Sequence, residues 1–456
     1  MIRRIALAAA IAFAATPASS LEMTDAEAAS ASRELLFGHP MISDAAVARL
    51  RARGEEDVLP ILALAMRYRG PSPILIEAAG FLAKEPIRNW ADLMLWIETQ
   101  DDFKPHPSYT SIKLDMARRI DPAFERFLGG DLAKPENMDI RPEEIVWGGV
   151  PVDGIPALDN PQMIDVGEAD YLKDDDLVFG VEIDGDARAY PLRIMGWHEM
   201  ANDVVGGVPI AIAYCTLCGA AILFDTAVDG WEKPFVFGSS GFLYRSNKLM
   251  FDRETDSLWN QFTGRPVSGP LRGSGIGLNV RPIATTSWGR WKAAHPDTKV
   301  LSLETGHRRD YGSGVVYKEY FSSPDLMFPT RVGDESVVKR KDVVFGVRGT
   351  AASRAWPVKA FENEPVINDV IGGQTIVLIG DADTRTVRAY ERKNRTFAEA
   401  DDGMLTDGES QWSVSEAALI GPDGARLSRI PGHLSYWFAW DGYFGAESTV
   451  YISGSN

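Results

Sequence analysis

The spacing of hydrophobic residues along the chain changes from helical to strand-like near residue 131. In the segments "DVLPILALAMRY", "PILIEAAGFLA" and "NWADLMLWIETQ", apolar side chains recur three and four residues apart, and Pro and Gly lie between the segments. Ser43, Asp44 and Asn89 are expected to cap helices, because short polar side chains accept hydrogen bonds from the first N–H groups of a helix. The pattern predicts an α-helical domain over residues 21–130, which we interpret as a scaffold or docking module.

Beyond residue 131 the pattern predicts short β-strands. The stretch "RPEEIVWGGVPVDGIPALDNP" is rich in Gly and Pro, which is typical of a structured connection. It is followed by "LVFGVEIDGDARAYPL", in which apolar and polar residues alternate on both sides of Asp184-Gly185, a pair that favours a tight hairpin turn. "VPIAIAY" and "AAILFD" are two further predicted strands.

The strand-rich part contains an internal repeat. "VFGVEIDGDARAYPL" returns 166 residues later as "VFGVRGTAASRAWPV", and at this offset Arg188 aligns with Arg354 and Asn202 with Asn368. Further on, "DRETDSLW" resembles "TDGESQW", and "SWGRW" resembles "YWFAW", in the same order. We therefore predict an α+β fold: an N-terminal α-helical domain followed by two duplicated, mainly antiparallel β units, sandwich- or barrel-like, over residues 131–324 and 325–456.

The two repeats differ at residues that could carry chemistry. The chain has two cysteines, and at the same offset Cys215 aligns with Asp381 and Cys218 with Thr384. In addition, His198 aligns with Glu364. This difference predicts a site in the first unit and a supporting role for the second.

The segment "YCTLCG", which holds both cysteines, has three interpretations. A structural disulfide suits an oxidising compartment, although so short a loop constrains the unfolded chain little. A redox dithiol suits the Cys-x-x-Cys spacing, although the usual redox motif opens a helix rather than joining strands. A metal site suits a knuckle-like turn between strands, in which Gly relieves crowding after the second cysteine. We carry the metal interpretation forward first, and the other two remain open.

A metal on Cys215 and Cys218 needs a further ligand, and His198 in "GWHEMAND" is the nearest candidate in the sequence. Two thiolates and an imidazole suit soft or borderline ions, so copper is the first choice and zinc the second. His198 could instead be a half-buried ring with no ligand role. Glu199 is expected to orient a ligand or to act as a general base.

A second polar stretch, "SSGFLYRSNKLMFDRETDSLW", supplies the other candidate catalytic residues. Arg245 and Asn247 join Glu199 as candidates, because they have no clear equivalent in the second repeat. Met250 is either a soft copper ligand or a core residue, and His307 is a second histidine that could bind a metal. The sequence contains no phosphate-binding loop, dinucleotide fingerprint or Gly-x-Ser-x-Gly elbow, which argues against nucleotide chemistry and ordinary esterases.

Composition and the N-terminus bear on compartment and partners. The first 20 residues, "MIRRIALAAAIAFAATPASS", have a positive start, a short apolar run and small residues, which predicts a signal peptide and a periplasmic or secreted protein. No later run reaches the roughly 18 apolar residues of a membrane span. The net charge of −17 argues against nucleic acid as a partner.

Several of these motifs together resemble a known family. "RAYPLRIMGWHEMANDVVGG", "AYCTLCGAAILFD", "SSGFLYRSNKLMFDRETDSLWNQFTG", "HPDTKVLSLETGHRRDYGSG" and "HLSYWFAW" are similar to an exported prokaryotic family, domain of unknown function 3179. The resemblance covers roughly residues 140–440 and leaves out the helical domain. It implies that Cys215-Thr216-Leu217-Cys218 is the central motif, with Thr where many members have Pro, and it implies no particular activity.

These observations favour an exported protein with a cysteine-centred copper or zinc site, acting as a metal-dependent oxidoreductase on a small substrate. The alternatives are a metal-binding or chaperone protein without turnover and a thiol–disulfide redox protein. An enzyme requires a pocket beside the cysteines lined by Glu199, Arg245 and Asn247, whereas a carrier requires an exposed pair of thiols. The expected partners are a small molecule or metal ion and, through the helical domain, a second protein.

Overall fold

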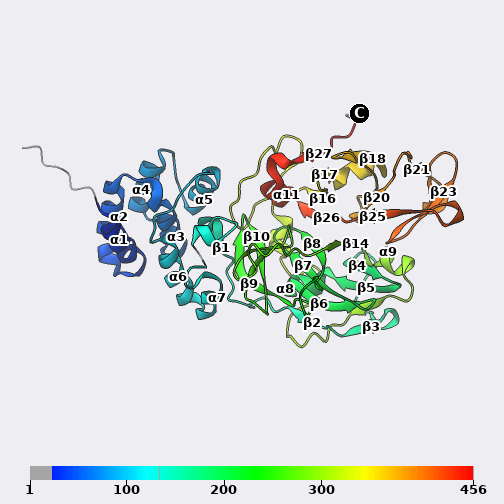
Figure 1. Ribbon diagram of the computed structural model, residues 1–456, viewed down its shortest axis with the longest axis horizontal. Coiled ribbons are helices and arrows are strands. Elements are labelled where there is room, and N and C mark those ends of the chain that lie inside the picture. The colour runs from blue at the N-terminus through cyan, green and yellow to red at the C-terminus, as the bar shows by residue number, and fades with distance from the viewer. Residues whose placement is uncertain (1–22, 133, 455–456) are drawn as a thin grey trace, which may run out of the picture.

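The computed structural model describes residues 23–132 and 134–454, so the predicted signal peptide at residues 1–20 lies outside the described residues. A helical N-terminal region stands at one end of an elongated molecule, and a β-rich body forms the rest (Figure 1). Within the described part of the chain, no helix is long and apolar enough to cross a membrane.

Seven α-helices form the N-terminal region within the described residues, and the first six share one apolar core. Asn89 caps the fifth helix as expected, because its side-chain oxygen accepts a hydrogen bond from the backbone N–H of Asp92 at 3.0 Å. The expectation for Ser43 and Asp44 was wrong: both lie inside α2, which begins at Pro40, and the ring of His39 caps it instead. The helices are α1 (Asp25–Phe37), α2 (Pro40–Arg53), α3 (Leu59–Arg69), α4 (Pro73–Ala83), α5 (Trp90–Thr99), α6 (Tyr109–Ile120) and α7 (Glu125–Leu128).

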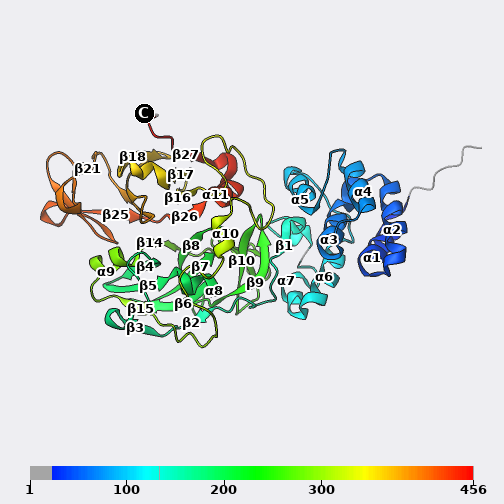
Figure 2. The ribbon, with the colours of Figure 1, turned by 180° about the vertical axis from the view of Figure 1, so that it is seen from behind.

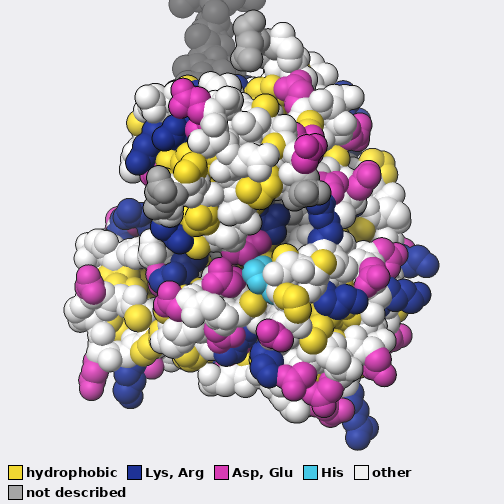
Figure 3. Space-filling view, turned by 90° about the vertical axis from the view of Figure 1, so that its right-hand side faces the viewer, with side chains coloured by type: hydrophobic (Ala, Val, Ile, Leu, Met, Phe, Trp, Pro, Cys, Tyr) yellow, Lys and Arg dark blue, Asp and Glu magenta, His cyan; other side chains and the backbone are white. Residues whose placement is uncertain are grey.

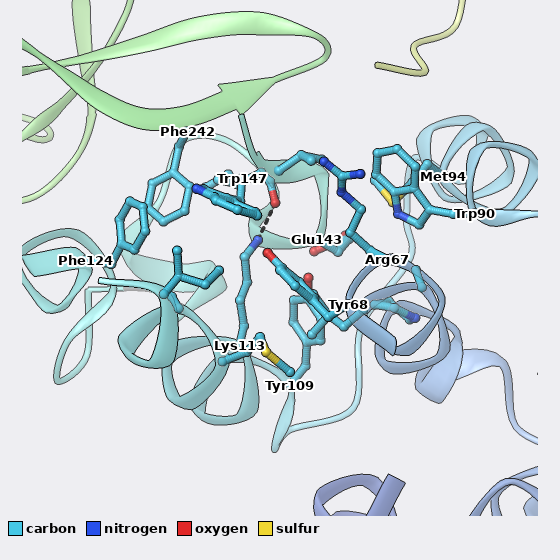
Figure 4. A pocket seen from close by; sticks show the side chains of 18 residues that line it. Arg67, Tyr68, Trp90, Met94, Tyr109, Lys113, Phe124, Glu143, Trp147 and Phe242 are labelled. Atoms are coloured by element: carbon cyan, nitrogen blue, oxygen red, sulfur yellow. Dashed lines mark hydrogen bonds between the residues drawn. The ribbon is translucent and has the colours of Figure 1, made fainter. Parts of the chain in front are cut away.

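Buried polar contacts join the helical region to the first strand, β1 (Ile145–Trp147). Lys113 on α6 is buried, and its ammonium donates hydrogen bonds to the carbonyl groups of Pro142 and Ile145. Burial lowers the pKa of Lys113 to about 7 and raises the pKa of nearby Glu143. Figure 4 shows both side chains around a cavity of about 30 Å³, which is room for little more than a buried water. The helical region is thus fixed to the β body by specific contacts rather than by a free linker.

The first β unit contains the strands from β4 to β15 and the helices α8 and α9, and the strands β1, β2 and β3 add to its sheets. One of its sheets has the order β14-β4-β5-β15-β3, a second the order β13-β8-β7-β6-β2, and a third the order β1-β9-β10-β11-β12. The bounds are β2 (Leu158–Asp159), β3 (Met163–Asp165), β4 (Leu177–Ile183), β5 (Asp186–Pro191), α8 (Leu192–His198), β6 (Met200–Val205), β7 (Val208–Cys215), β8 (Ala220–Asp225), β9 (Phe237–Tyr244), β10 (Asn247–Asp252), β11 (Leu258–Asn260), β12 (Arg265–Ser268), β13 (Val280–Arg281), β14 (Ala284–Ser287), α9 (Trp288–Ala294) and β15 (Lys299–Leu301).

The second β unit repeats this order strand for strand, from β16 to β27. Its sheets have the orders β26-β16-β17-β27 and β18-β19-β20-β25-β24-β23-β22-β21. One sheet of the β body is nearly closed and barrel-like. The bounds are β16 (Val343–Arg348), β17 (Ser353–Pro357), β18 (Val366–Ile371), β19 (Gln374–Asp381), β20 (Thr386–Glu391), β21 (Ala398–Glu399), β22 (Leu405–Thr406), β23 (Gln411–Val414), β24 (Ala418–Ile420), β25 (Arg426–Ile430), β26 (His433–Tyr436), α11 (Trp437–Phe444) and β27 (Ser448–Val450).

Equivalent residues in the two units make equivalent ion pairs and hydrogen bonds, which confirms the predicted duplication. Arg188 on β5 pairs with Asp203 at 2.8 Å, and Arg354 on β17 pairs with Asp369 at 3.0 Å. Asn202 exchanges two hydrogen bonds with the backbone of Phe237, as Asn368 does with Phe397. These polar contacts hold the same pairs of strands together in both copies.

A close contact between glycine and tryptophan is also duplicated. Gly180 on β4 lies against the indole of Trp291 on α9, and Gly346 on β16 lies against the indole of Trp440 on α11. A Cβ atom at either glycine would overlap the indole ring. The repeated "VFGV" motif therefore supplies the glycine of this contact, and the motifs "SWGRW" and "YWFAW" supply the tryptophan.

The contacts between the two β units are approximately two-fold symmetric. β26 of the second unit packs on β8 of the first, and β14 of the first packs on β20, the equivalent of β8. Thr286 and Thr386 share a hydrogen bond of 2.7 Å across this interface. At one end the units leave a hollow of about 270 Å³ where acidic and basic side chains gather (Figure 3). Each unit therefore presents its β7–β8 or β19–β20 turn towards the other unit.

Gly346→Ala is expected to reduce the free energy of unfolding by about 1–3 kcal/mol, because its Cβ would overlap Trp440 in a packed core. Gly180→Ala should have a similar effect through Trp291, and urea unfolding measures both. Gly167→Ala is the matched control, since a Cβ at this exposed glycine meets no atom within 4 Å. Equal stability of all three variants would contradict the packing contact.

Glu98→Gln is expected to remove a pH dependence of stability. Burial raises the pKa of Glu98 to about 7, above its unfolded value of about 4.3. Folding therefore favours the protonated acid, and the free energy of unfolding should fall on the order of 2 kcal/mol as the pH rises from about 4.5 to 7. Chemical unfolding across this range should show the fall in the native protein and in Glu85→Gln, an exposed control, but not in Glu98→Gln.

Candidate functional site

The site forms around a disulfide in the turn between β7 and β8. Cys215 ends β7, and it is joined to Cys218 with a Cα–Cα distance of 5.3 Å. Gly219 then takes a left-handed backbone conformation, φ 61°, which allows β8 to begin at Ala220 opposite Cys215. Both cysteines are buried, with 2% and 0% of their surface exposed. The turn is therefore a rigid, covered element rather than an exposed pair of thiols.

A buried ion pair lies against this turn. Glu199 follows α8 in a left-handed conformation, φ 55°, and its carboxylate accepts a hydrogen bond of 2.6 Å from the hydroxyl of Thr216, between the cysteines. The other carboxylate oxygen accepts from the ammonium of Lys248 at 3.2 Å. All three side chains are buried, and burial lowers the pKa of Lys248 despite the nearby carboxylate. The cysteine turn is thus hydrogen-bonded to a buried carboxylate, and that carboxylate is paired with a buried ammonium.

The hairpin turn between β9 and β10 holds Asn247 beside Cys218. Arg245 and Ser246 both have positive φ, 48° and 60°, as a type I′ turn requires. The side-chain oxygen of Asn247 lies 3.0 Å from the Cys218 sulfur and accepts the backbone N–H of Lys248 at 2.9 Å. A disulfide sulfur has no hydrogen to donate, so this contact becomes a hydrogen bond when Cys218 is a thiol. The backbone N–H of Lys248 thus holds the Asn247 side-chain oxygen against the Cys218 sulfur.

The ring of His198 has protein partners on both nitrogens. Nδ1 lies 2.8 Å from the carbonyl oxygen of Pro156, and Nε2 lies 2.6 Å from the hydroxyl of Tyr311. Burial lowers the pKa of His198 to about 4, so the ring is neutral at pH 7, with Nδ1 donating to Pro156 and Nε2 accepting from Tyr311. The second candidate histidine, His307, is exposed and lies beside it, with 5.3 Å between ring centroids. His198 would have to give up one of these partners to bind a metal.

Arg245 makes its contacts away from the cysteines. Its guanidinium pairs with Glu144 at 2.7 Å and donates to the carbonyl oxygen of Gly442 on α11. The structure therefore brings Glu199 and Asn247 to the cysteine turn but directs Arg245 to the junction with the helical region. Met250 is buried in the same apolar cluster as both cysteines. Across residues 23–132 and 134–454, no group of three or more His, Cys, Asp and Glu side chains is arranged to hold a metal.

Sequence reasoning missed the segment that covers the site. Residues 302–342, here called the strap, run from β15 to β16 and include α10 (Lys318–Ser322), which lies between the two β units (Figure 2). The hydroxyl of Tyr320 donates to the carbonyl oxygen of Leu217 at 2.7 Å, and the carbonyl oxygen of Phe328 accepts from Ser246 at 3.3 Å. The strap therefore contacts both the cysteine turn and the hairpin turn beside it.

Lys248 was also missed, although the sequence carries a signal for it. In "SNKLMFD" the lysine occupies a strand position among apolar residues, and the structure buries it. A buried lysine is rare unless it has a partner. Its partner Glu199 lies 49 residues away in the chain, which the pattern alone does not reveal.

The duplicated β body that carries the cysteine turn is the part of the chain that matches a known family. Residues 152–447 match the family described as a protein of unknown function, DUF3179, so the chain belongs to this family. The match spans both β units and the cysteine turn and leaves out the helical region, which confirms the resemblance seen in the sequence. No curated protein and no solved structure matches the chain.

Replacing both cysteines by serine is expected to leave the fold intact. Closing a loop of this length stabilises a protein by about 2 kcal/mol at most in the chain-entropy model, because the bridge joins residues only three apart. Urea unfolding of the Cys215→Ser, Cys218→Ser double variant measures the loss. A loss of more than about 4 kcal/mol, the scale expected of long-range bridges, would show that the disulfide is mainly structural.

Proposed function

We propose that Cys215 and Cys218 are the redox centre of an exported thiol–disulfide protein, which cycles between disulfide and dithiol. The observation that carries the proposal is the buried pair Glu199–Lys248, which is hydrogen-bonded to Thr216 inside the cysteine turn. The predicted signal peptide and the oxidising compartment it implies are consistent with this function.

The energetics favour a functional role for the ion pair. Removing two charges from water costs several kcal/mol per ion, and the mutual attraction of the pair often fails to recover this cost. A disulfide that served only to stabilise the fold would need no such pair beside it. Perturbed, buried charges next to a reactive group are instead typical of functional sites.

The proposed reaction is thiol–disulfide exchange with a thiol reductant. A thiolate attacks the sulfur of Cys215, the slightly more exposed of the two residues, and forms a mixed disulfide while Cys218 leaves as a thiolate and takes up a proton from solvent. A second reductant thiol then attacks the mixed disulfide, Cys215 is released, and the reductant leaves as its own disulfide. In the dithiol product, Cys218 donates its S–H to Asn247.

The strap limits which thiol reductant can reach the two sulfurs. Because the strap covers the turn through Tyr317 and Tyr320, a small thiol reaches the disulfide more readily than a folded protein does. A protein partner would have to displace the strap. The helical region is attached to the strap, because Glu98 accepts hydrogen bonds from Thr330 and Arg331. A protein that docks on the helical region could therefore move the strap, and this region is the candidate docking site.

Lys248→Met and Glu199→Gln are expected to shift the thiol pKa values of the reduced protein in opposite directions. Lys248→Met leaves an uncompensated carboxylate beside the turn and should raise them by about 1 unit, because a nearby negative charge disfavours a thiolate. Glu199→Gln leaves an uncompensated ammonium and should lower them by about 1 unit. Thiolate absorbance followed against pH measures both shifts.

The second β unit supplies a matched control. Arg290 pairs with Asp381, the residue that takes the place of Cys215 in the equivalent turn. Arg290→Gln should therefore disturb an ion pair at a similar turn and leave the thiol pKa values unchanged. Shifts in the same direction for Lys248→Met and Glu199→Gln, or no shift in either, would contradict a redox role for the pair.

A soft metal on the reduced cysteines is the second candidate function, with copper first and zinc second. Met200 and Met250 are buried in the same cluster as both cysteines, and thioether and thiolate sulfur together favour Cu(I). Anaerobic titration of the reduced protein with Cu(I) or Zn(II) tests it, with the cysteine double variant as the control and His198→Ala as a test of the third ligand. Stoichiometric binding that needs both cysteines would favour a metal-binding protein, and turnover of a substrate by the loaded protein would favour an oxidoreductase.

A further inference from the structure

A cavity of about 220 Å³ lies between the two β units, next to the cysteine turn. Tyr214 and Gly219, which line it, flank the two cysteines in the chain. On the opposite wall, Tyr436 of β26 donates its backbone N–H to the carbonyl oxygen of Cys218 at 2.7 Å. The cavity is therefore separated from the disulfide only by the residues of the turn itself.

The lining of this cavity is mostly apolar and aromatic. Leu434, Phe179 and Phe321 line it together with the rings of Tyr214 and Tyr436. Pockets for small molecules usually combine such a lining with a few placed polar groups, over roughly 300–1,000 Å³ for drug-sized ligands. This cavity is smaller, and it matches a ligand of one or two rings.

Ser435 and Arg385 are polar residues of the lining, and they differ in access. The hydroxyl of Ser435 makes no hydrogen bond among the described residues, but it is fully buried, so a molecule in the cavity does not reach it. The guanidinium of Arg385 is in an exposed residue at the cavity wall and has no ion pair or side-chain hydrogen bond in the described chain. Its positive charge acts on the hydroxyls of both Tyr214 and Tyr436, which places it close to the two rings. The wall of the apolar cavity thus carries a cation that has no ion-pair partner among the described residues.

The two β units contribute different residues to this cavity at one equivalent position. Gly219 and Arg385 occupy equivalent positions after the two turns, and both are left-handed, with φ 61° and 54°. At Gly219 a Cβ atom would press on the ring of Tyr436 at 3.3 Å, so the glycine lets that ring approach the cysteine turn. At Arg385 the same backbone conformation is unfavourable for a side chain and is retained nonetheless.

We propose that this cavity binds a planar aromatic carboxylate of one or two rings. The rings would stack among Tyr214, Tyr436 and the neighbouring phenylalanines, where offset and edge contacts are favourable. The carboxylate would pair with the guanidinium of Arg385, whose planar fork matches it in a bidentate geometry. The link of this ligand to the redox centre rests on the function proposed above, whereas its binding does not.

Binding of 2-naphthoate, followed by isothermal titration calorimetry, tests the proposal. The native protein should bind one 2-naphthoate per chain, and Arg385→Gln should weaken the binding about tenfold, which corresponds to about 1.4 kcal/mol. Ser435→Ala should bind as tightly as the native protein, because the Ser435 hydroxyl has no surface open to the cavity. Arg290→Gln, at an exposed arginine of the same interface that does not line the cavity, should bind as tightly as the native protein.

Two further measurements test the role of the carboxylate charge and separate ligand binding from the proposed redox function. The neutral analogue 2-naphthalenemethanol should bind the native protein and Arg385→Gln equally, because it offers the guanidinium no charge. The Cys215→Ser, Cys218→Ser variant should still bind 2-naphthoate, which keeps the result independent of the redox function. Absence of saturable 2-naphthoate binding to the folded native protein, or equal affinity of Arg385→Gln, would overturn the proposal.

Discussion

The ion pair between Glu199 and Lys248 is the interaction on which the arrangement of the site depends. The backbone carbonyl of Glu199 accepts the N–H of Tyr214, and its carboxylate reaches Thr216 on one side and Lys248 on the other. A single residue therefore joins the end of α8, the cysteine turn and the hairpin β9–β10. Because both charges are buried, removing either partner would leave an uncompensated charge in the interior, which is strongly destabilising. The pair thus constrains three elements to one geometry around the disulfide.

The duplication explains how this geometry arose on a stable scaffold. The contacts that both units share, such as Arg188–Asp203 with Arg354–Asp369, lie within the sheets and determine which strands pair. The cysteines and the residues that replace them lie at the turn between the fourth and fifth strands of the repeat, β7–β8 and β19–β20. The two units direct these turns towards each other. In the second unit Asp381 accepts hydrogen bonds from the backbone of its own turn and pairs with Arg290 of the first unit, so this turn serves the interface. In the first unit the same turn holds the disulfide.

The fold could be predicted from the sequence because its signals are local or repeat at one offset. The helical spacing before residue 131 and the pair Asp184-Gly185 each report on neighbouring residues, and the structure has helices and a β4–β5 turn there. The repeat was visible because packing preserves its residues: the indoles of Trp259 and Trp412 both donate to an aspartate, Asp252 and Asp407.

The site was predictable only in part, because its contacts join residues far apart in the chain. Glu199 and Asn247 were found as polar residues near the cysteines, and both touch the turn or its sulfur. His198 was chosen for its closeness in sequence, but its Nε2 partner Tyr311 lies 113 residues away on the strap. The position of Arg245 in a hairpin turn directs its side chain to Glu144, 101 residues away. No local pattern contains such pairings.

A redox titration of the native protein tests the central claim most directly. The protein would be equilibrated in buffers of defined ratios of reduced to oxidised dithiothreitol, and its free thiols and its folded state would be measured in the same samples. If Cys215 and Cys218 form a redox centre, the folded protein should show a reversible, two-electron transition between disulfide and dithiol. The potential should lie above about −300 mV, the range in which labile disulfides lie. A disulfide that resists reduction throughout, or that is reduced only as the protein unfolds, would contradict the account.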